Sequence, residues 1–304
     1  MPNADRGSTP AGFRMQLLRR LNDHAREQKI AVQRLQQQVA FERLLARLAG
    51  SGQWILKGGF ALQLRFGWGN RPTRDIDLRT EADIREAIVR LRSEVAESSL
   101  SDQFTFDLGE LENELQGAPG GAVRIPVVAR VAGVVLARFH IDLASGDAVI
   151  GPPVEMQGSN LLDFAGFQRL RFPVYPIAQH LAEKLHAYTL PRDRENSRAK
   201  DLVDLVTIVA IEAVDGRSLT ASLHATFTAR NSHSLPVSFP EPPRGWAAAY
   251  RKLADESLAV VSANLSEGYR AAARFWDPVL KGEVEGSRWD VRSKNWQACP
   301  STQA

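Results

Sequence analysis

Two aspartates one residue apart, Asp75 and Asp77, are the first feature of the sequence that could carry chemistry. They lie in residues 73–79, whose alternating polar and apolar residues predict a β-strand. Side chains two positions apart in a strand point to the same side, so both carboxylates would face one way while Ile76 and Leu78 enter the core. Adjacent carboxylates repel each other unless a cation compensates them. All-oxygen ligands suit Mg²⁺ or Mn²⁺, which keep bound water and bridge to substrate phosphates.

A pair of glycines precedes these aspartates. Gly58 and Gly59 follow Lys57, between an apolar strand predicted at residues 53–56 and a helical run at 60–65. Glycines at a helix start let a phosphate approach the backbone N–H groups at the positive end of the helix, and Lys57 would add a charge nearby. Each motif alone has an ordinary explanation, a turn for the glycines and a solvated strand edge for the aspartates. In succession they are typical of nucleotidyl transfer.

A third carboxylate lies in a later apolar strand. In residues 138–143, alternation puts His140 and Asp142 on one face and the apolar residues on the other. An aspartate in such a strand is costly to bury unless it meets a metal or another cation. Asp142 would therefore complete a carboxylate triad able to hold two metal ions, or act as general base toward an incoming hydroxyl. His140 is better explained as a structural histidine than as a ligand.

Two later helices carry further charged candidates. Lys184 lies in a helix predicted at residues 176–190, where its ammonium group could neutralise charge on a leaving pyrophosphate. Asp201 and Asp204 lie one turn apart in a helix predicted at residues 198–211. That helix is equally compatible with nucleotide positioning by Asp204 and with a solvent-exposed face of surface ion pairs.

The elements that must position these residues change in character along the chain. Strands are predicted at residues 53–56, 73–79, 104–108, 122–131 and 134–143, with a hairpin at Ala132-Gly133 between the last two. Helices are predicted at residues 13–48 (two helices, broken around 27–29), 81–95, 176–190, 198–211 and 246–276. This order indicates an α+β protein with one domain over residues 1–155 and a mainly helical domain over residues 156–304.

Composition narrows the class of protein. Of 304 residues, 44% are hydrophobic and 24% charged, as in ordinary globular proteins. The single cysteine, Cys299, excludes an internal disulfide framework and cysteine-rich metal sites, and it favours a reducing, cytoplasmic location. No apolar stretch approaches the roughly 18 residues of a membrane span, so no membrane partner is expected. The net charge of +3 permits nucleic-acid contact without arguing for it.

A series of motifs, in this order along the chain, resembles the AbiEii/AbiGii toxin family, which includes the MenT-type nucleotidyltransferase toxins. The motifs are Lys57-Gly58-Gly59-Phe60-Ala61-Leu62, Asp75-Ile76-Asp77-Leu78, Ile141-Asp142-Leu143-Ala144-Ser145-Gly146-Asp147, Ala182-Glu183-Lys184-Leu185 and Arg198-Ala199-Lys200-Asp201-Leu202-Val203-Asp204-Leu205. Family members commonly carry Gly-Ser where this chain has Gly58-Gly59. Phosphate contact is therefore expected from backbone N–H groups and Lys57 rather than from a serine hydroxyl.

The resemblance implies a polymerase-β-type nucleotidyltransferase domain with a mixed sheet, followed by a helical C-terminal domain. It also implies a cognate antitoxin encoded beside the toxin, and transfer of nucleotides, often pyrimidines, to the 3′ end of tRNA, which stops translation. Some members of the family are silenced by phosphorylation of a hydroxyl residue just before the first catalytic aspartate. Thr73, two residues before Asp75, occupies that place.

Together these features predict a metal-dependent nucleotidyltransferase. The NTP phosphates would lie at residues 57–59, Asp75 and Asp77 would hold the metal, and Asp142 would be a third ligand or the base. A hydroxyl acceptor would attack the α-phosphate in line and release pyrophosphate. Two alternatives stay open, which are nucleotidylation of a protein or small molecule and a non-catalytic module that binds RNA or an antitoxin.

Overall fold

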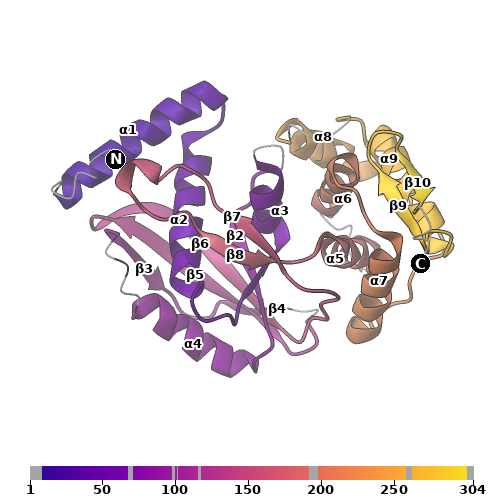
Figure 1. The fold of residues 1–304 in the computed structure, drawn as a ribbon, viewed down its shortest axis with the longest axis horizontal. Helices are drawn as coiled ribbons and strands as arrows, with labels where there is room; N and C mark the ends of the chain where they lie inside the picture. The colour runs from indigo at the N-terminus through magenta and orange to yellow at the C-terminus, as the bar shows by residue number, and fades with distance from the viewer. Residues whose placement is uncertain are drawn as a thin grey trace. The chain divides into compact units, whose positions relative to one another are not determined.

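A computed structural model describes residues 9–67, 71–97, 100, 102–115, 118–191, 198–257 and 262–299. The chain forms two compact units, and neither is continuous in sequence (Figure 1). The first comprises residues 1–64, 73–146 and 154–174, and the second comprises residues 65–72, 147–153 and 175–304. The domain division between residues 155 and 156 stays a prediction, because the two units interleave along the chain.

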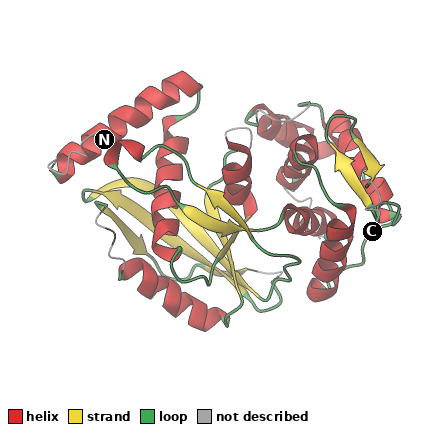
Figure 2. Cartoon of the chain, viewed as in Figure 1, coloured by secondary structure: helices red, strands yellow, loops and turns green. Residues whose placement is uncertain are grey.

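A mixed eight-stranded sheet is the frame of the first unit, which confirms the predicted α+β class (Figure 2). Its strands are β1 (Ile55–Lys57), β2 (Asp75–Thr80), β3 (Phe104–Leu108), β4 (Asn113–Leu115), β5 (Ala122–Val131), β6 (Val134–Ser145), β7 (Val154–Gln157) and β8 (Arg171–Val174). Their spatial order is β3-β5-β6-β2-β1-β8-β7, and β4 pairs with β5. The pairs β2–β6 and β1–β8 are parallel.

The predicted hairpin joins β5 to β6. Its two loop residues, Ala132 and Gly133, have φ values of 50° and 76°. Two successive positive φ values belong to the tight turn whose twist matches the flanking strands. The turn sets the pairing of the strand ends beside it, and a register shift between Ala129 and Arg130 then gives the register on which the position of Asp142 depends.

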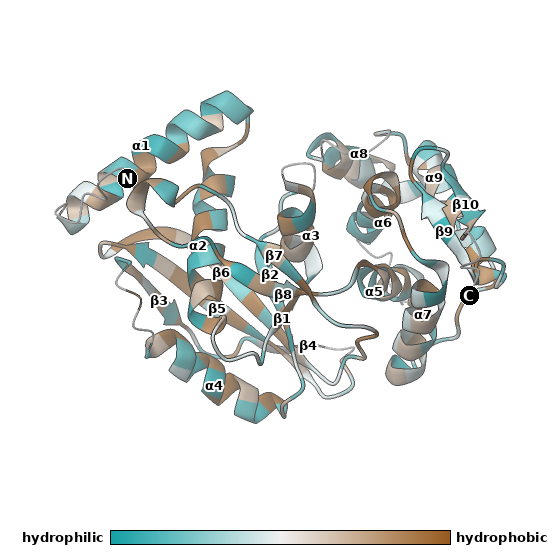
Figure 3. Cartoon of the chain, viewed as in Figure 1, coloured by the Kyte–Doolittle hydropathy of each residue, from teal (hydrophilic) through white to brown (hydrophobic). Residues whose placement is uncertain are grey.

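Hydrophobic and hydrophilic residues alternate along strands of the sheet (Figure 3), and the apolar side chains of one face are buried. Ile76 and Leu78 of β2 and Ile141 and Leu143 of β6 belong to the hydrophobic core. The helices α2 (Val32–Leu48) and α4 (Ile84–Ala96) contribute the facing side chains of the same core. The residues between these apolar positions must consequently point to the other face.

In the first unit the predicted N-terminal helices are present, whereas the strands β4, β7 and β8 were not predicted. α1 (Pro10–Gln28) and α2 confirm the two N-terminal helices, and Lys29, with φ of 54°, ends the first. α3 (Gly58–Phe66) begins directly after β1, so the two glycines are its first residues. A short 3₁₀ helix (Asp163–Ala165) precedes β8.

The second unit is mainly helical. It contains α5 (Ile177–Thr189), α6 (Ala199–Ile211), α7 (Gly216–Arg230), a 3₁₀ turn (Arg244–Trp246), α8 (Ala247–Asp255), α9 (Leu265–Leu280) and a hairpin of β9 (Ser287–Asp290) with β10 (Asn295–Ala298). None of the described helices is long and apolar enough to cross a membrane.

Two sequence predictions for this unit were wrong or incomplete. The single helix predicted over residues 246–276 is two helices, and Asn264 starts the second by accepting hydrogen bonds from the N–H groups of Ser266 and Glu267. α7 was not predicted, because its many serines, threonines and alanines give no clear apolar stripe. Most of the charged loop predicted at residues 191–197 lies outside the described residues.

Candidate active site

Asp75 and Asp77 lie on the face of the sheet opposite the core. Ile76, between them, is fully buried, whereas both aspartates are half-buried. The alternation predicted from the sequence is therefore present in β2. Nothing but the period of the strand is needed to place the two carboxylates side by side.

A row of charged residues crosses four neighbouring strands on this face. Lys57 of β1 is the antiparallel partner of Asp77, which is the parallel partner of Asp142 in β6. Asp142 is in turn the partner of Arg124 in β5. Residues in register on adjacent strands have neighbouring side chains on one face. The order of charges across the strands is therefore cation, carboxylate, carboxylate, cation. Asp75 lies on the same face of β2, two residues before Asp77.

Arg124 binds Asp142 through a two-pronged ion pair. Arg124 Nε donates to Asp142 Oδ1 at 2.8 Å and Nη2 donates to Oδ2 at 2.7 Å. The same Nη2 lies 3.7 Å from Asp75 Oδ2. The hydrogen bonds to Asp142 are the main reason why the pKa of Arg124 is raised; burial opposes them, and the charges of Asp142, Asp75 and Asp77 reinforce them. Arg124 is thus the cation that compensates this end of the row.

His140 links Asp75 to a further acid. Its Nδ1 lies 3.4 Å from Asp75 Oδ1, and its Nε2 lies 3.3 Å from Glu112 Oε2. His140 is the strand partner of Asp75, so the contact follows directly from the β2–β6 register. The imidazole therefore orients Asp75 from the side.

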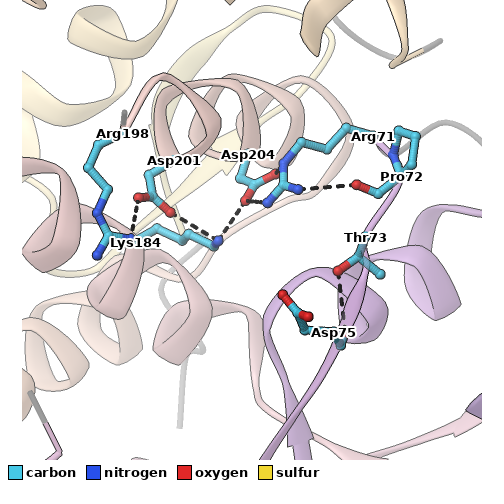
Figure 4. A network of polar contacts seen from close by, with 8 residues as sticks. All are labelled: Arg71, Pro72, Thr73, Asp75, Lys184, Arg198, Asp201 and Asp204. Carbon is cyan, nitrogen blue, oxygen red and sulfur yellow. Dashed lines mark hydrogen bonds and ion pairs between the residues drawn. The ribbon is translucent and has the colours of Figure 1, made fainter. Parts of the chain in front are cut away.

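The two glycines are required by how closely other residues approach them. Gly58 has φ of +65°, and a Cβ added there would lie 1.9 Å from a carboxylate oxygen of Asp77. A Cβ on Gly59 would lie 2.6 Å from the hydroxyl oxygen of Thr73. Thr73 Oγ1 itself donates to the backbone oxygen of Asp75 at 3.4 Å (Figure 4). The start of α3 is therefore packed against both ends of the Thr73–Asp77 segment.

The donor set of this face fits a hard divalent cation. Mg²⁺ is commonly held by one or two carboxylates together with water and substrate phosphates, which Asp75 and Asp77 can supply. Within the described residues, no three His, Cys, Asp or Glu side chains are grouped as a ready-made metal site. Asp142, the third predicted ligand, has both oxygens on Arg124.

Lys184 and Asp204 belong to the second unit, where they form a buried ionic network (Figure 4). Lys184 Nζ lies 2.6 Å from Asp204 Oδ2 and 3.1 Å from Asp201 Oδ1. Arg71 binds Asp204 through Nε and Nη2, each at 2.8 Å. Arg198 Nη1 completes the network 3.1 Å from Asp201 Oδ2.

The burial of this network decides one alternative left open by the sequence. Asp201 is 2% exposed and Asp204 is fully buried. The interpretation of this side of α6 as a solvent-exposed face with surface ion pairs is therefore wrong. Burial by itself raises the pKa of Asp204, but the charges of Arg71 and Lys184 outweigh it and bring that pKa to about 2. Burial lowers the pKa of Lys184, and its two aspartate partners reverse this to give a net increase.

Other charged residues of the motifs are structural in the second unit. Arg230 Nη2 lies 3.0 Å from Asp147 Oδ1 and 3.4 Å from Glu183 Oε2. Asp147 is only 2% exposed. Asp147 is therefore a buried partner of Arg230 in α7.

The aromatic residues of the second unit pack inside it. Trp246, Tyr250, Phe275, Trp276 and Trp289 are all buried, and Trp289 donates its indole N–H to the backbone oxygen of Val209. These five side chains are therefore part of the packing inside this unit. A cavity of about 280 Å³ lies beside Trp289 between α6 and α9, and none of the predicted site residues lines it.

Arg124, Arg71, Glu112 and Arg230 belong to these networks but were not predicted. Arg124 is a charged residue between apolar ones in residues 122–131. A charged residue within an apolar strand is also the signal that identified Asp142, so Arg124 could have been predicted. Arg71 gives no such signal, because it lies in a loop and its partner Asp204 is 133 positions away.

Known proteins resemble this chain in sequence family and in fold. A family model described as the AbiEii nucleotidyl transferase toxin of a type IV toxin–antitoxin system matches residues 40–275. MenT4, a nucleotidyltransferase toxin from Mycobacterium tuberculosis H37Rv, has a TM-score of 0.53 at 18% identity, covering 91% of this chain and 99% of its own. An H. pylori protein provisionally described as a nucleotidyltransferase has a TM-score of 0.50 at 15% identity, covering 83% of this chain and 98% of its own. No curated protein matches the chain in sequence. The fold is that of the polymerase-β-type nucleotidyltransferases, as predicted.

Proposed function

Because this chain belongs to the AbiEii family of nucleotidyl transferase toxins, we propose that it transfers a nucleotide from an NTP to the 3′ end of tRNA and so blocks translation. The observation that carries the proposal is the row of Lys57, Asp77, Asp142 and Arg124 in register on the open face of the sheet, with Asp75 beside it. Two adjacent carboxylates there could hold a metal ion, and the cations on either side could compensate the phosphates of a nucleotide.

The phosphates of the NTP are proposed to lie at the start of α3. Backbone N–H groups at a helix N-terminus bind phosphate, and glycines let it approach closely. Gly58 and Gly59 meet this need, and Lys57 contributes its charge from the adjoining end of β1. In the proposed site, Asp75 and Asp77 hold Mg²⁺ or Mn²⁺, with Asp142 as third ligand or base. The metal ion would supply charge stabilisation to the α-phosphate.

The proposed reaction is an in-line displacement at the α-phosphorus. The 3′ hydroxyl oxygen of the acceptor forms a bond to that phosphorus, and the bond to the bridging oxygen of pyrophosphate breaks. The hydroxyl proton passes to a carboxylate of the row, for which Asp142 is the candidate. Lys184 is proposed to neutralise charge on the leaving pyrophosphate and Asp204 to position it for this role, which is consistent with the 2.6 Å contact between them.

Thr73 is the proposed place of control by the cognate antitoxin. Its hydroxyl lies against Gly59 at the start of α3, so a phosphate attached there would occupy the space proposed for the NTP phosphates. Phosphopeptide mass spectrometry after co-expression with the protein encoded by the neighbouring gene tests this, and an unmodified Thr73 in the silenced protein contradicts it.

The acceptor can be identified by following the label from each common α-³²P-labelled NTP. The purified chain is incubated with Mg²⁺, total tRNA and a cell extract, and RNA, protein and small molecules are then separated. We expect label in tRNA, strongest with a pyrimidine NTP, absent with EDTA, and absent when the tRNA 3′ end has been oxidised with periodate. Label in the protein or small-molecule fraction instead of tRNA would show that tRNA is not the acceptor. Equal labelling of oxidised tRNA would show that the nucleotide is not transferred to the 3′ end.

A further inference from the structure

Arg124 is an unusual neighbour for carboxylates that are proposed to bind a divalent cation. Its guanidinium group occupies both oxygens of Asp142, at 2.8 and 2.7 Å, and reaches to 3.7 Å from Asp75. About a third of the Arg124 side chain is exposed. The group is therefore accessible to a ligand on the open face of the sheet, although its present partners are carboxylates of the same site.

The geometry sets Arg124 and a metal ion in direct competition. A cation that binds Asp142 needs a carboxylate oxygen that Arg124 now holds, and it would stand at short range from a fixed positive charge. Like charges at this distance repel strongly in a half-buried site. Arginine is not deprotonated in proteins, so the guanidinium group of Arg124 keeps its charge at every accessible pH.

A nucleotide would remove this obstacle. The planar fork of arginine binds phosphate with the same two-pronged geometry as carboxylate. Phosphates at the start of α3 would add negative charge beside Asp77, whose carboxylate contacts the position of Gly58. They would thus offer Arg124 another partner and compensate the incoming cation.

We propose that Arg124 is a positioning residue that keeps Asp142 from divalent cations until an NTP binds, when the phosphates replace Asp142 as the partner of the guanidinium group. This rests on the proposed function, since it assigns a step to the same site. The consequence is that free Mg²⁺ or Mn²⁺ binds the protein weakly and that metal and nucleotide bind with strong positive coupling.

The test is a titration of the full chain with Mn²⁺, followed by the electron paramagnetic resonance signal of free Mn²⁺. It is done without nucleotide and with a non-hydrolysable CTP analogue that carries a methylene bridge between the α- and β-phosphorus atoms. The variants are Arg124→Gln and Arg124→Lys, with Arg130→Gln as matched control. Arg130 lies on the same strand and pairs with Asp107, an exposed aspartate on β3.

Without nucleotide, we expect Arg124→Gln to bind Mn²⁺ at least about tenfold more tightly than the wild type, the size of change typical around metal ligands. Arg124→Lys keeps a charge but frees one oxygen of Asp142, so its affinity should rise less. Arg130→Gln should equal the wild type. With the analogue, the wild type should gain affinity for Mn²⁺, and Arg124→Gln should gain less.

Mn²⁺ affinity that is unchanged in both Arg124 variants overturns the inference, as does an equal gain from nucleotide in wild type and Arg124→Gln. Circular dichroism checks that the variants are folded, and the lysine variant serves if the glutamine variant is not. The proposed function is tested by label transfer to tRNA, and this titration tests only the role of Arg124. The two failures can therefore be distinguished. Loss of Mn²⁺ binding in Asp75→Asn confirms that the titrated ion lies at this site.

Discussion

Gly59 and Thr73 show how single residues adapt to each other in this site. The room that a side chain at position 59 would need is filled by the hydroxyl and Cβ of Thr73, at 2.6 and 2.8 Å from an added Cβ. The resemblance predicts a serine at position 59. Its absence here therefore has a physical reason, because Thr73 already supplies a hydroxyl at the same helix start.

The conflict between a side chain at position 59 and Thr73 can be tested by substituting the two residues singly and together. Gly59→Ser alone should destabilise the protein by about 1–3 kcal/mol, the usual cost of overpacking, and lower nucleotidyl transfer. Thr73→Ala in the same chain should restore much of both, because it removes the atoms in conflict. Chemical denaturation and label transfer are the measurements.

Gly50→Ser is the matched control, since a Cβ there meets nothing within 4 Å. It should leave stability and activity near those of the wild type. The account of position 59 would be contradicted if Gly59→Ser were as harmless as Gly50→Ser, or if the double variant were no better than the single one.

The face of each carboxylate could be predicted at this scale, but its partners could not. Alternation alone put Asp75 and Asp77 opposite the core. The contacts of Asp142 with Arg124 depend on the register of β5 against β6, which a one-residue slip would change completely. Sequence spacing does not fix that register, because it depends on the turn at Ala132-Gly133 and also on the register shift between Ala129 and Arg130.

At the scale of elements, the sequence of α6 left two interpretations open. Asp201 and Asp204 are both buried, where Lys184 of α5 and Arg71 contact them. Arg71 lies in residues 65–72 of the second unit, 133 positions from Asp204 in sequence. A partner so distant in sequence leaves no local pattern.

Removing one carboxylate of this network should be costly. Asp204→Asn leaves Arg71 and Lys184 with too little negative charge in a buried site, and we expect a loss of about 3–5 kcal/mol in the free energy of unfolding. Urea denaturation followed by tryptophan fluorescence measures it. Asp107→Asn, which breaks an exposed pair with Arg130, is the control and should change little. Equal effects of the two substitutions would show that the buried pairs contribute no more than surface ones.

The same network sets a pH dependence. The pKa of Asp204 is about 2 in the folded protein and about 3.9 when unfolded. A lowered pKa stabilises the folded state above the unfolded value, so this contribution is complete above about pH 4 and is lost as the pH falls toward 2. Asp204→Asn should lack this part of the acid sensitivity. An unaltered slope of unfolding free energy between pH 4 and 2 would contradict the assignment.

At the scale of the whole molecule, a net charge of +3 says little, because the charges are arranged in balanced groups. In the first unit, Lys57 and Arg124 flank two carboxylates in register. In the second, cations from three segments surround Asp201 and Asp204. The α+β class was predictable from the order of strands and helices. The interleaving of the two units was not, since it depends on contacts between distant segments.

The central claim is that the carboxylate row performs nucleotidyl transfer, and its most direct test compares two aspartates of one sheet. Single-turnover transfer of α-³²P-labelled nucleotide to tRNA is measured for the wild type, Asp77→Asn and Asp107→Asn. We predict that Asp77→Asn loses transfer by at least about 100-fold, as expected for loss of a group that stabilises transition-state charge. Asp107→Asn should transfer at the wild-type rate. Transfer by Asp77→Asn at the rate of Asp107→Asn, or none by the folded wild type, would contradict the account.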